Sequence, residues 1–427
     1  MQEPSSSSPH FTSLDLPAGL ALTPEQKRVK ELGRELAKDF RTRAAEHDRS
    51  RTSPLENYTK LREAGLYGVV IPKELGGMGL GSVGYVALAE ELAQGCASTA
   101  LSFNMHINAT GGIPQRPAIS SSVKELVAKL VLKDGALLSA SASEPNSSSL
   151  LPRAYRFSVV ARKVAGGYSL HGRKMFCSMF EASDYCYLFA HPEGHPNPYK
   201  TIAVLVPTKQ DELTVTDIWE TLGLRATRSN QVDYHGAFVP DDLVLCELDD
   251  FVQGFIIQEA AWAFGGFCAC YMGLGLAIVD FARQHLSTRK ATGYAQVIGY
   301  HPDISRRFAE MVVDAETARL MVYRAAWESD QRGPSMETFQ CWLKAKMTVG
   351  AAVQRIVNNA AIACGMHSLF RNQGLELLIR DATTAPIMPP NSDLCAATIG
   401  LLSLGLDPGA APSLLMSEPL LENSLKP

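Results

Sequence analysis

The stretch YRFSVVARKVAGGYSLHGRKMFCS, Tyr155–Ser178, decides the fold of this chain. Apolar and polar residues alternate on both sides of Gly166-Gly167, which is the pattern of two antiparallel strands joined by a tight turn. Further short strand patterns follow: YCYLFAH, TIAVLVP, LTVTDI, QVDYHGAFVP and LVLCEL. We therefore predict a compact, mostly antiparallel β domain over residues 135–249.

Helical patterns flank this domain on both sides. After Thr23, apolar residues at Val29, Leu32, Leu36 and Phe40 recur at the spacing of one helix face. Beyond residue 250 the helical patterns are as long as the helices of a four-helix bundle. We predict an α+β fold in this order: a disordered tail (1–22), an N-terminal helical domain (23–134), a central antiparallel β domain (135–249), a C-terminal four-helix bundle (250–407) and a tail (408–427).

Composition excludes several classes of protein. The chain has 427 residues, 46% of them hydrophobic and 20% charged, so it is neither disordered throughout nor collagen-like. Its net charge of −4 offers no large positive field, and we expect no nucleic-acid partner. Residues 1–22 lack the basic and apolar regions of a signal peptide, and we expect a cytoplasmic protein. The apolar stretch Ala260–Val279 is broken by four glycines, which favours a buried core helix over a membrane span.

Nine cysteines are scattered along the chain without a CxxC pair. An odd number without close spacing predicts buried free thiols in a reducing compartment. The ten histidines form no HExxH motif, so we expect no metal site.

Six short motifs, in chain order, indicate a family. They are Ser143–Ser149 (SEPNSSS), Gly172–Ser178 (GRKMFCS), Leu222–Ser229 (LGLRATRS) with a later Phe238-Val239-Pro240, Arg289–Gly293 (RKATG), Cys364-Gly365 and Ile379–Ala382 (IRDA). Together they resemble the acyl-CoA dehydrogenase superfamily of flavoproteins. The resemblance runs from about Thr23 to Asp407. No Rossmann GxGxxG motif competes with it.

The resemblance implies an FAD site. The hydroxyls and backbone of the first motif would lie against the flavin and its diphosphate, Phe176 would supply a flat face for the ring, and Ser178 a hydroxyl near flavin N5. Arg289 would reach the diphosphate of a neighbouring subunit, which implies a homotetramer. Taken without the resemblance, a solvated charge at a helix end is the better interpretation of Arg289. The cofactor-binding residues so implied are Ser143, Ser148, Ser149, Phe176, Ser178, Arg289, Gly365 and Asn391.

The catalytic glutamate of the family is missing. In the family's spacing, counting from Arg380 leads to Pro389, and counting back from Arg289 to the alternative position leads to Ala263. Proline and alanine cannot accept a proton. The remaining candidates for proton transfer are His106, Glu259 and His367, with Asp393 as a further one.

Three functions fit these observations. The first is an FAD-dependent oxidoreductase that oxidises an acyl thioester, carried by CoA or an acyl carrier protein, by hydride transfer to flavin N5. It would pass electrons to oxygen or to an electron-transfer flavoprotein. The second is a two-component monooxygenase that takes reduced flavin from a reductase and hydroxylates a small aromatic or amine substrate. It needs no α-carbanion, so Pro389 does not oppose it. The third is a flavin-binding or catalytically inactive helper. We expect no membrane partner.

Overall fold

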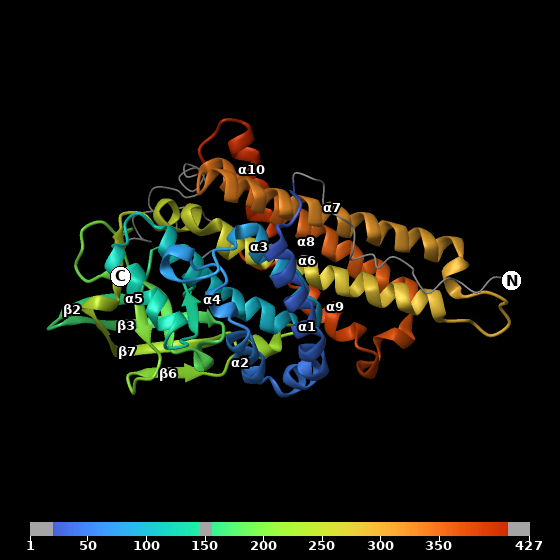
Figure 1. The fold of residues 1–427 in the computed structure, drawn as a ribbon, viewed down its shortest axis with the longest axis horizontal. Coiled ribbons are helices and arrows are strands. Elements are labelled where there is room, and N and C mark those ends of the chain that lie inside the picture. Colours follow the sequence, from blue (N-terminus) through green and yellow to red (C-terminus); the bar gives the residue numbers. More distant parts are fainter. Residues whose placement is uncertain (1–19, 146–155, 409–427) are drawn as a thin grey trace, which may run out of the picture.

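The structure is a computed structural model that describes residues 20–145 and 156–408. The strands gather at one end of an elongated molecule, and three long helices extend side by side toward the other end (Figure 1). Most of the two predicted tails lies outside the described residues, and so do Ser148 and Ser149.

The N-terminal region is helical, as predicted. Its first helix begins at a capping box, in which Thr23 accepts from the Gln26 backbone and the Gln26 side chain accepts from the Thr23 backbone. Two of the later helices, α3 and α4, are buried along almost their whole length. The helices are α1 (Pro24–Ser50), α2 (Leu55–Glu63), α3 (Gly81–Gly95), α4 (Ala97–Gln115) and α5 (Ser121–Leu132).

The central sheet has the strand order β6-β7-β3-β2-β4-β5-β8, with β1 paired to β4. The predicted hairpin is present, with Val164 opposite Gly167 across the turn. The domain is mixed rather than wholly antiparallel, because β4 pairs in parallel with both β1 and β2. The strands are β1 (Leu138–Ser141), β2 (Val160–Val164), β3 (Gly167–Cys177), β4 (Tyr185–Pro192), β5 (Thr201–Pro207), β6 (Leu213–Thr216), β7 (Asn230–Pro240) and β8 (Val244–Leu248).

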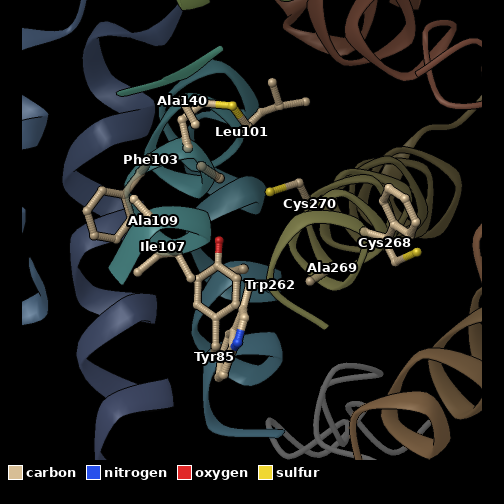
Figure 2. Packing of buried hydrophobic residues seen from close by; sticks show 14 of the residues in the cluster. Tyr85, Leu101, Phe103, Ile107, Ala109, Ala140, Trp262, Cys268, Ala269 and Cys270 are labelled. Atoms are coloured by element: carbon tan, nitrogen blue, oxygen red, sulfur yellow. The ribbon is translucent and has the colours of Figure 1, made fainter. Parts of the chain in front are cut away.

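The C-terminal helices pack around α6. This helix is long and apolar enough to cross a membrane, but 89% of its most apolar window is buried within the fold. Gly266 lets it approach α4, because a Cβ at that position would meet Asn104 Oδ1 at 1.6 Å. Figure 2 shows side chains from both helices at this contact: Phe103 and Ile107 belong to α4, and Trp262, Cys268 and Cys270 belong to α6. After a π-helical turn (Val252–Ile256), the helices are α6 (Ile257–Thr288), α7 (Pro302–Arg332), α8 (Met336–Cys364), α9 (Leu375–Ala382) and α10 (Ser392–Ser403).

A buried charge network ties the N-terminal helices to the bundle. Glu90 on α3 is 1% exposed and accepts hydrogen bonds from Lys30 Nζ on α1 at 2.8 Å and Arg319 Nε on α7 at 3.0 Å. The two cations hold the pKa of Glu90 below its ordinary value against the opposing effect of burial. Losing the carboxylate charge would remove a neutralising partner of Arg319 and leave Lys30 with its 3.4 Å contact to Glu91.

We predict that Glu90→Gln lowers the free energy of unfolding by about 3 kcal/mol, because breaking a buried ion pair from one side costs about that much. The measurement is urea unfolding followed by circular dichroism. Glu35→Gln is the matched control: Glu35 pairs with Lys38 on the surface, and its loss should cost under about 0.5 kcal/mol. Equal stability of the two variants would contradict the network's role.

Candidate functional site: an aromatic pair on the β domain

The end of β3 presents an aromatic ring to solvent. Phe176 has a φ of 57°, a left-handed conformation that side chains rarely adopt, and its side chain is 52% exposed. The pairing of β3 with β7 is irregular between Lys174 and Cys177, which turns this residue out of the ladder. Such an arrangement costs free energy and leaves apolar surface in water, so it is typical of a binding site.

A second aromatic residue stands beside Phe176. The ring of Trp219 lies 6.1 Å from it at an angle of 73°, an edge-to-face arrangement. Trp219 is fixed by a 2.9 Å hydrogen bond from Nε1 to the Leu224 carbonyl, and its neighbours Ile218 and Leu222 are exposed. Sequence reasoning missed this residue; the signal was a tryptophan among polar residues in the loop TDIWETLG.

Small polar groups lie next to the pair. The Ser178 hydroxyl is hydrogen-bonded to that of Ser229 at 2.7 Å, and Ser229 to that of Thr227 at 2.7 Å. The Ser143 carbonyl accepts from the Met175 backbone at 2.9 Å, so this predicted cofactor residue lies alongside β3. Three predicted cofactor residues, Ser143, Phe176 and Ser178, are therefore brought to one end of β3.

The loop that carries Trp219 is held by α9. Asp381 accepts from the Leu224 backbone at 2.6 Å, and Arg380 donates to the Leu222 carbonyl at 2.9 Å. Gly223 allows this contact, since a Cβ there would meet the Arg380 carbonyl at 2.3 Å. Arg380 also pairs with Asp48 of α1 at 2.7 Å. The RDA motif thus joins all three regions of the chain behind the aromatic pair.

His106 occupies a structural position. It is fully buried, its Nε2 lies 2.9 Å from the Tyr67 carbonyl, and its Nδ1 accepts from the Leu138 backbone at 3.1 Å. Burial lowers the pKa of this histidine to about 4. Both ring nitrogens are engaged, and His106 links α4 to β1 through these contacts. Proton removal by His106 stays a prediction from the sequence.

Glu259 lies in an ion pair inside the protein. It is 1% exposed and accepts from the Arg116 guanidinium and from Tyr187 Oη, the latter at 3.0 Å. Its carboxylate fits against Gly112, where a Cβ would come within 2.2 Å of Glu259 Cδ. Burial raises the pKa of Glu259 to about 7, despite the opposing effect of Arg116. Arg116, Tyr187 and Gly112 therefore enclose the carboxylate of Glu259.

The other candidates lie apart from the aromatic pair. Asn391 caps α10 by accepting from the Leu394 backbone at 2.8 Å, and Asp393 is exposed in the first turn of that helix. Gly365 ends α8 with a φ of 74°, and His367 follows it on the surface. Arg289 ends α6, is exposed, and donates to the Cys364 carbonyl at 3.3 Å. The last three share one location, distinct from that of Asn391.

The cysteines and the possible metal ligands are the remaining reactive side chains. All nine cysteines are free, and eight are buried, as predicted for thiols that pack in a core. Within residues 20–145 and 156–408, no group of three or more His, Cys, Asp or Glu side chains could hold a metal ion.

Comparison with known protein families identifies the family of this chain. Residues 23–115 match the family description "Acyl-CoA dehydrogenase, N-terminal domain", and residues 253–399 match "Acyl-CoA dehydrogenase, C-terminal domain". The two matches cover more than half of the chain. The chain belongs to the acyl-CoA dehydrogenase family. This assignment confirms the resemblance read from the sequence and the α+β architecture predicted from it.

Relatives within the family carry two kinds of name. The chain is 28% identical to "Putative acyl-CoA dehydrogenase YdbM" of Bacillus subtilis, over 86% of this chain and 94% of that protein. It is also 28% identical to a dibenzothiophene monooxygenase of Rhodococcus erythropolis, over 63% of this chain and 67% of that enzyme. Both names are those of oxidoreductases.

Solved structures show the same division. Butyryl-CoA dehydrogenase of Megasphaera elsdenii superposes with a TM-score of 0.81 at 19% identity, covering 92% of this chain and all of that one. TdsC of Paenibacillus sp. A11-2, in complex with FMN and indole, superposes with a TM-score of 0.80 at 22% identity, covering 88% and 97%. These likenesses establish the fold that the acyl-CoA dehydrogenase family shares.

The Asp381 carboxyl should make stability depend on pH. Burial raises its pKa to about 7, above the ordinary value of 3.8, so the folded state binds its proton more tightly than the unfolded state does. The native state should therefore lose stability as pH rises from 5 to 8, by as much as about 3 kcal/mol from this group.

Comparing the wild type with Asp381→Asn isolates the effect, because asparagine keeps an acceptor for the Leu224 backbone and does not titrate. We expect the stability advantage of Asp381→Asn over the wild type to grow from pH 5 to pH 8 in urea titrations. Asp393→Asn, at an exposed position, should show no such trend. A constant difference between wild type and Asp381→Asn would contradict the prediction.

Proposed function

We propose that this chain is a flavin-dependent oxidoreductase that binds FAD against Phe176 and Trp219. An exposed, conformationally restricted phenylalanine with a fixed tryptophan beside it fits a large planar ring. Ser178 adds a hydroxyl at the same end of β3. Fold neighbours solved with FMN or FAD, TdsC and PigA, support this proposal.

The reaction that the geometry supports best is oxygen insertion into a small aromatic or amine substrate, with reduced flavin supplied by a separate reductase. The observation that carries it concerns proton acceptors. Pro389 and Ala263 stand at the two positions where the family resemblance leads us to expect a glutamate, and His106 is bound through both ring nitrogens. A thioester oxidation needs a base at the substrate, whereas oxygen insertion does not. The order of preference drawn from the sequence is therefore reversed.

In this proposal a bound flavin would supply the redox chemistry. The residues of the chain would do the rest: Phe176 and Trp219 hold the ring plane, and Ser178 orients a polar edge by hydrogen bonding.

Oxidation of an acyl thioester is the second candidate, and Glu259 is the observation that favours it. Its pKa of about 7 suits a general base, and its Oε2 is buried with no hydrogen-bond partner among the described residues. In this reading Glu259 would swing away from Arg116 when substrate enters, and the thioester would be carried by CoA or a carrier protein. An electron-transfer flavoprotein or oxygen would accept the electrons.

One pair of assays separates the candidates. The first mixes the FAD-loaded protein, without oxygen, with a panel of acyl-CoA thioesters and follows the oxidised flavin absorbance. The second supplies a flavin reductase, NADH and ¹⁸O₂ with indole or dibenzothiophene, and seeks ¹⁸O in the product by mass spectrometry. We expect no bleaching in the first assay and labelled product in the second. Bleaching would favour the thioester reaction, and failure of both with FAD bound would favour the helper role.

The cofactor site has its own test. We predict that Phe176→Ala weakens FAD binding about tenfold, because one aromatic contact contributes about 1 kcal/mol or more. The measurement is quenching of flavin fluorescence on titration with protein. Phe238→Ala is the matched control, since Phe238 is a similarly exposed phenylalanine of the same domain, on β7. Equal affinity of the two variants would place the flavin elsewhere.

The homotetramer and the cytoplasmic location stay predictions from the sequence. A subunit interface that includes Arg289 would be consistent with its exposure at the end of α6.

A further inference from the structure

A small cavity lies where the beginnings of α3, α6 and α8 meet the end of α7. Its volume is about 20 Å³, and Trp262 on α6 and Trp342 on α8 are among the residues that line it. A cavity of this size holds one group about as large as a water molecule. None of the lining residues belongs to the aromatic site on the β domain.

The lining of this cavity is negatively charged. Asp330, near the end of α7, is the one charged residue that lines it, and Asp330 is exposed. Its carboxylate accepts from the backbone of Ser82 at 2.6 Å and of Val83 at 3.0 Å, in the first turn of α3. Gly81 allows this contact, because a Cβ there would meet Asp330 Oδ1 at 2.8 Å.

The charge of Asp330 is only partly balanced by its surroundings. The N-terminus of a helix offsets about half an elementary charge. In the part of the chain that the structure describes, no Lys, Arg or His side chain forms an ion pair with Asp330. A carboxylate can accept about four hydrogen bonds, so Asp330 keeps acceptor capacity beyond its two backbone contacts.

A buried hydroxyl on the same cavity has no partner. Ser82 is 1% exposed, and its Oγ forms no hydrogen bond within the described residues. The neighbouring indoles do not supply one, since Trp262 Nε1 donates to Gln115 Oε1 at 3.1 Å and Trp342 Nε1 donates to Ser329 Oγ at 2.9 Å. Buried polar groups in folded proteins are nearly always hydrogen-bonded, so the Ser82 hydroxyl points to a polar group held in the cavity.

A small cation with N–H donors satisfies both observations. It can donate to Ser82 Oγ and pair with the Asp330 carboxylate, and aromatic residues in the lining favour positive charge. A water molecule would satisfy the hydroxyl and leave the carboxylate without a counter-ion.

We infer that this cavity binds the ammonium group of a primary amine, with Asp330 as its counter-ion and Ser82 as its hydrogen-bond acceptor. The rest of the amine leaves through the solvent-exposed side at Asp330. Free ammonium ion has the same chemistry and is the other source. The inference does not rest on the proposed function, because no contact with a flavin enters it.

The test is a titration of the purified full chain with methylammonium chloride at constant ionic strength, followed by tryptophan fluorescence. We expect a saturable change. Methanol, which is similar in size and neutral, and tetramethylammonium, which is larger and has no N–H donor, should give none. Butylammonium that binds as well as methylammonium would identify the amine of a larger molecule, and binding of ammonium alone would identify the free ion.

Two variants locate the site. Asp330→Asn keeps an acceptor for the first turn of α3 and removes the charge, so it should weaken methylammonium binding about tenfold. Ser82→Ala leaves that contact with α3 in place and should weaken binding about threefold. Asp393→Asn is the matched control, because it removes an exposed carboxylate from the first turn of α10 and should leave the affinity unchanged.

Several results would overturn the inference. They are the absence of a saturable change, an equal response to methanol or tetramethylammonium, unchanged affinity in Ser82→Ala, and equal affinity of Asp330→Asn and Asp393→Asn. The flavin assays are independent of these results. If no flavin binds while methylammonium binds as described, the proposed function fails and the inference stands.

Discussion

Arg380 and Asp381 stand side by side at the end of α9, and their charges serve three segments at once. Arg380 donates hydrogen bonds to Asp48 on the first helix and to the carbonyl of Leu222 in the β domain. Asp381 accepts a hydrogen bond from the backbone N–H of Leu224. Burying a carboxylate is expensive unless its hydrogen bonds are made, so this junction constrains the position of everything it touches. The loop of Trp219 is fixed from behind by the C-terminal helices, and the orientation of the aromatic pair follows from that contact.

Local pattern predicted much of the architecture. Alternation around Gly166-Gly167 located the hairpin, and helical spacing located the bundle, because both depend on which face of a short segment is buried. The parallel strand β1 escaped prediction, since LSAS is four residues long and buried on both faces. Its place beside β4 is set by partners nearly fifty residues away in the chain, which no local pattern records.

The residues of the candidate site also fall into two groups: some follow from a local motif, and others depend on partners that are distant in the chain. Two residues implied by the motif along β3, Phe176 and Ser178, lie close together because they are two positions apart at the end of that strand. The single residues proposed by elimination are held in contacts with distant parts of the chain. His106 is bonded to residues 39 and 32 positions away, and Glu259 to one 143 positions away, so their availability depended on tertiary contacts that the sequence does not display. The tryptophan at position 219 was overlooked for the same reason, because it lies in a loop and its partner Phe176 lies on β3, far earlier in the chain.

The two charge networks also bear on motion. Lys30, Glu90 and Arg319 clamp α1 and α3 to α7, and Asp48 with Arg380 clamps the far end of α1 to α9. A helix fixed to the bundle at both ends cannot act as a hinged lid, because rigid rotation would break one clamp or the other. The first helix therefore belongs to the rigid frame of the protein, and any motion that admits a ligand has to take place in other segments.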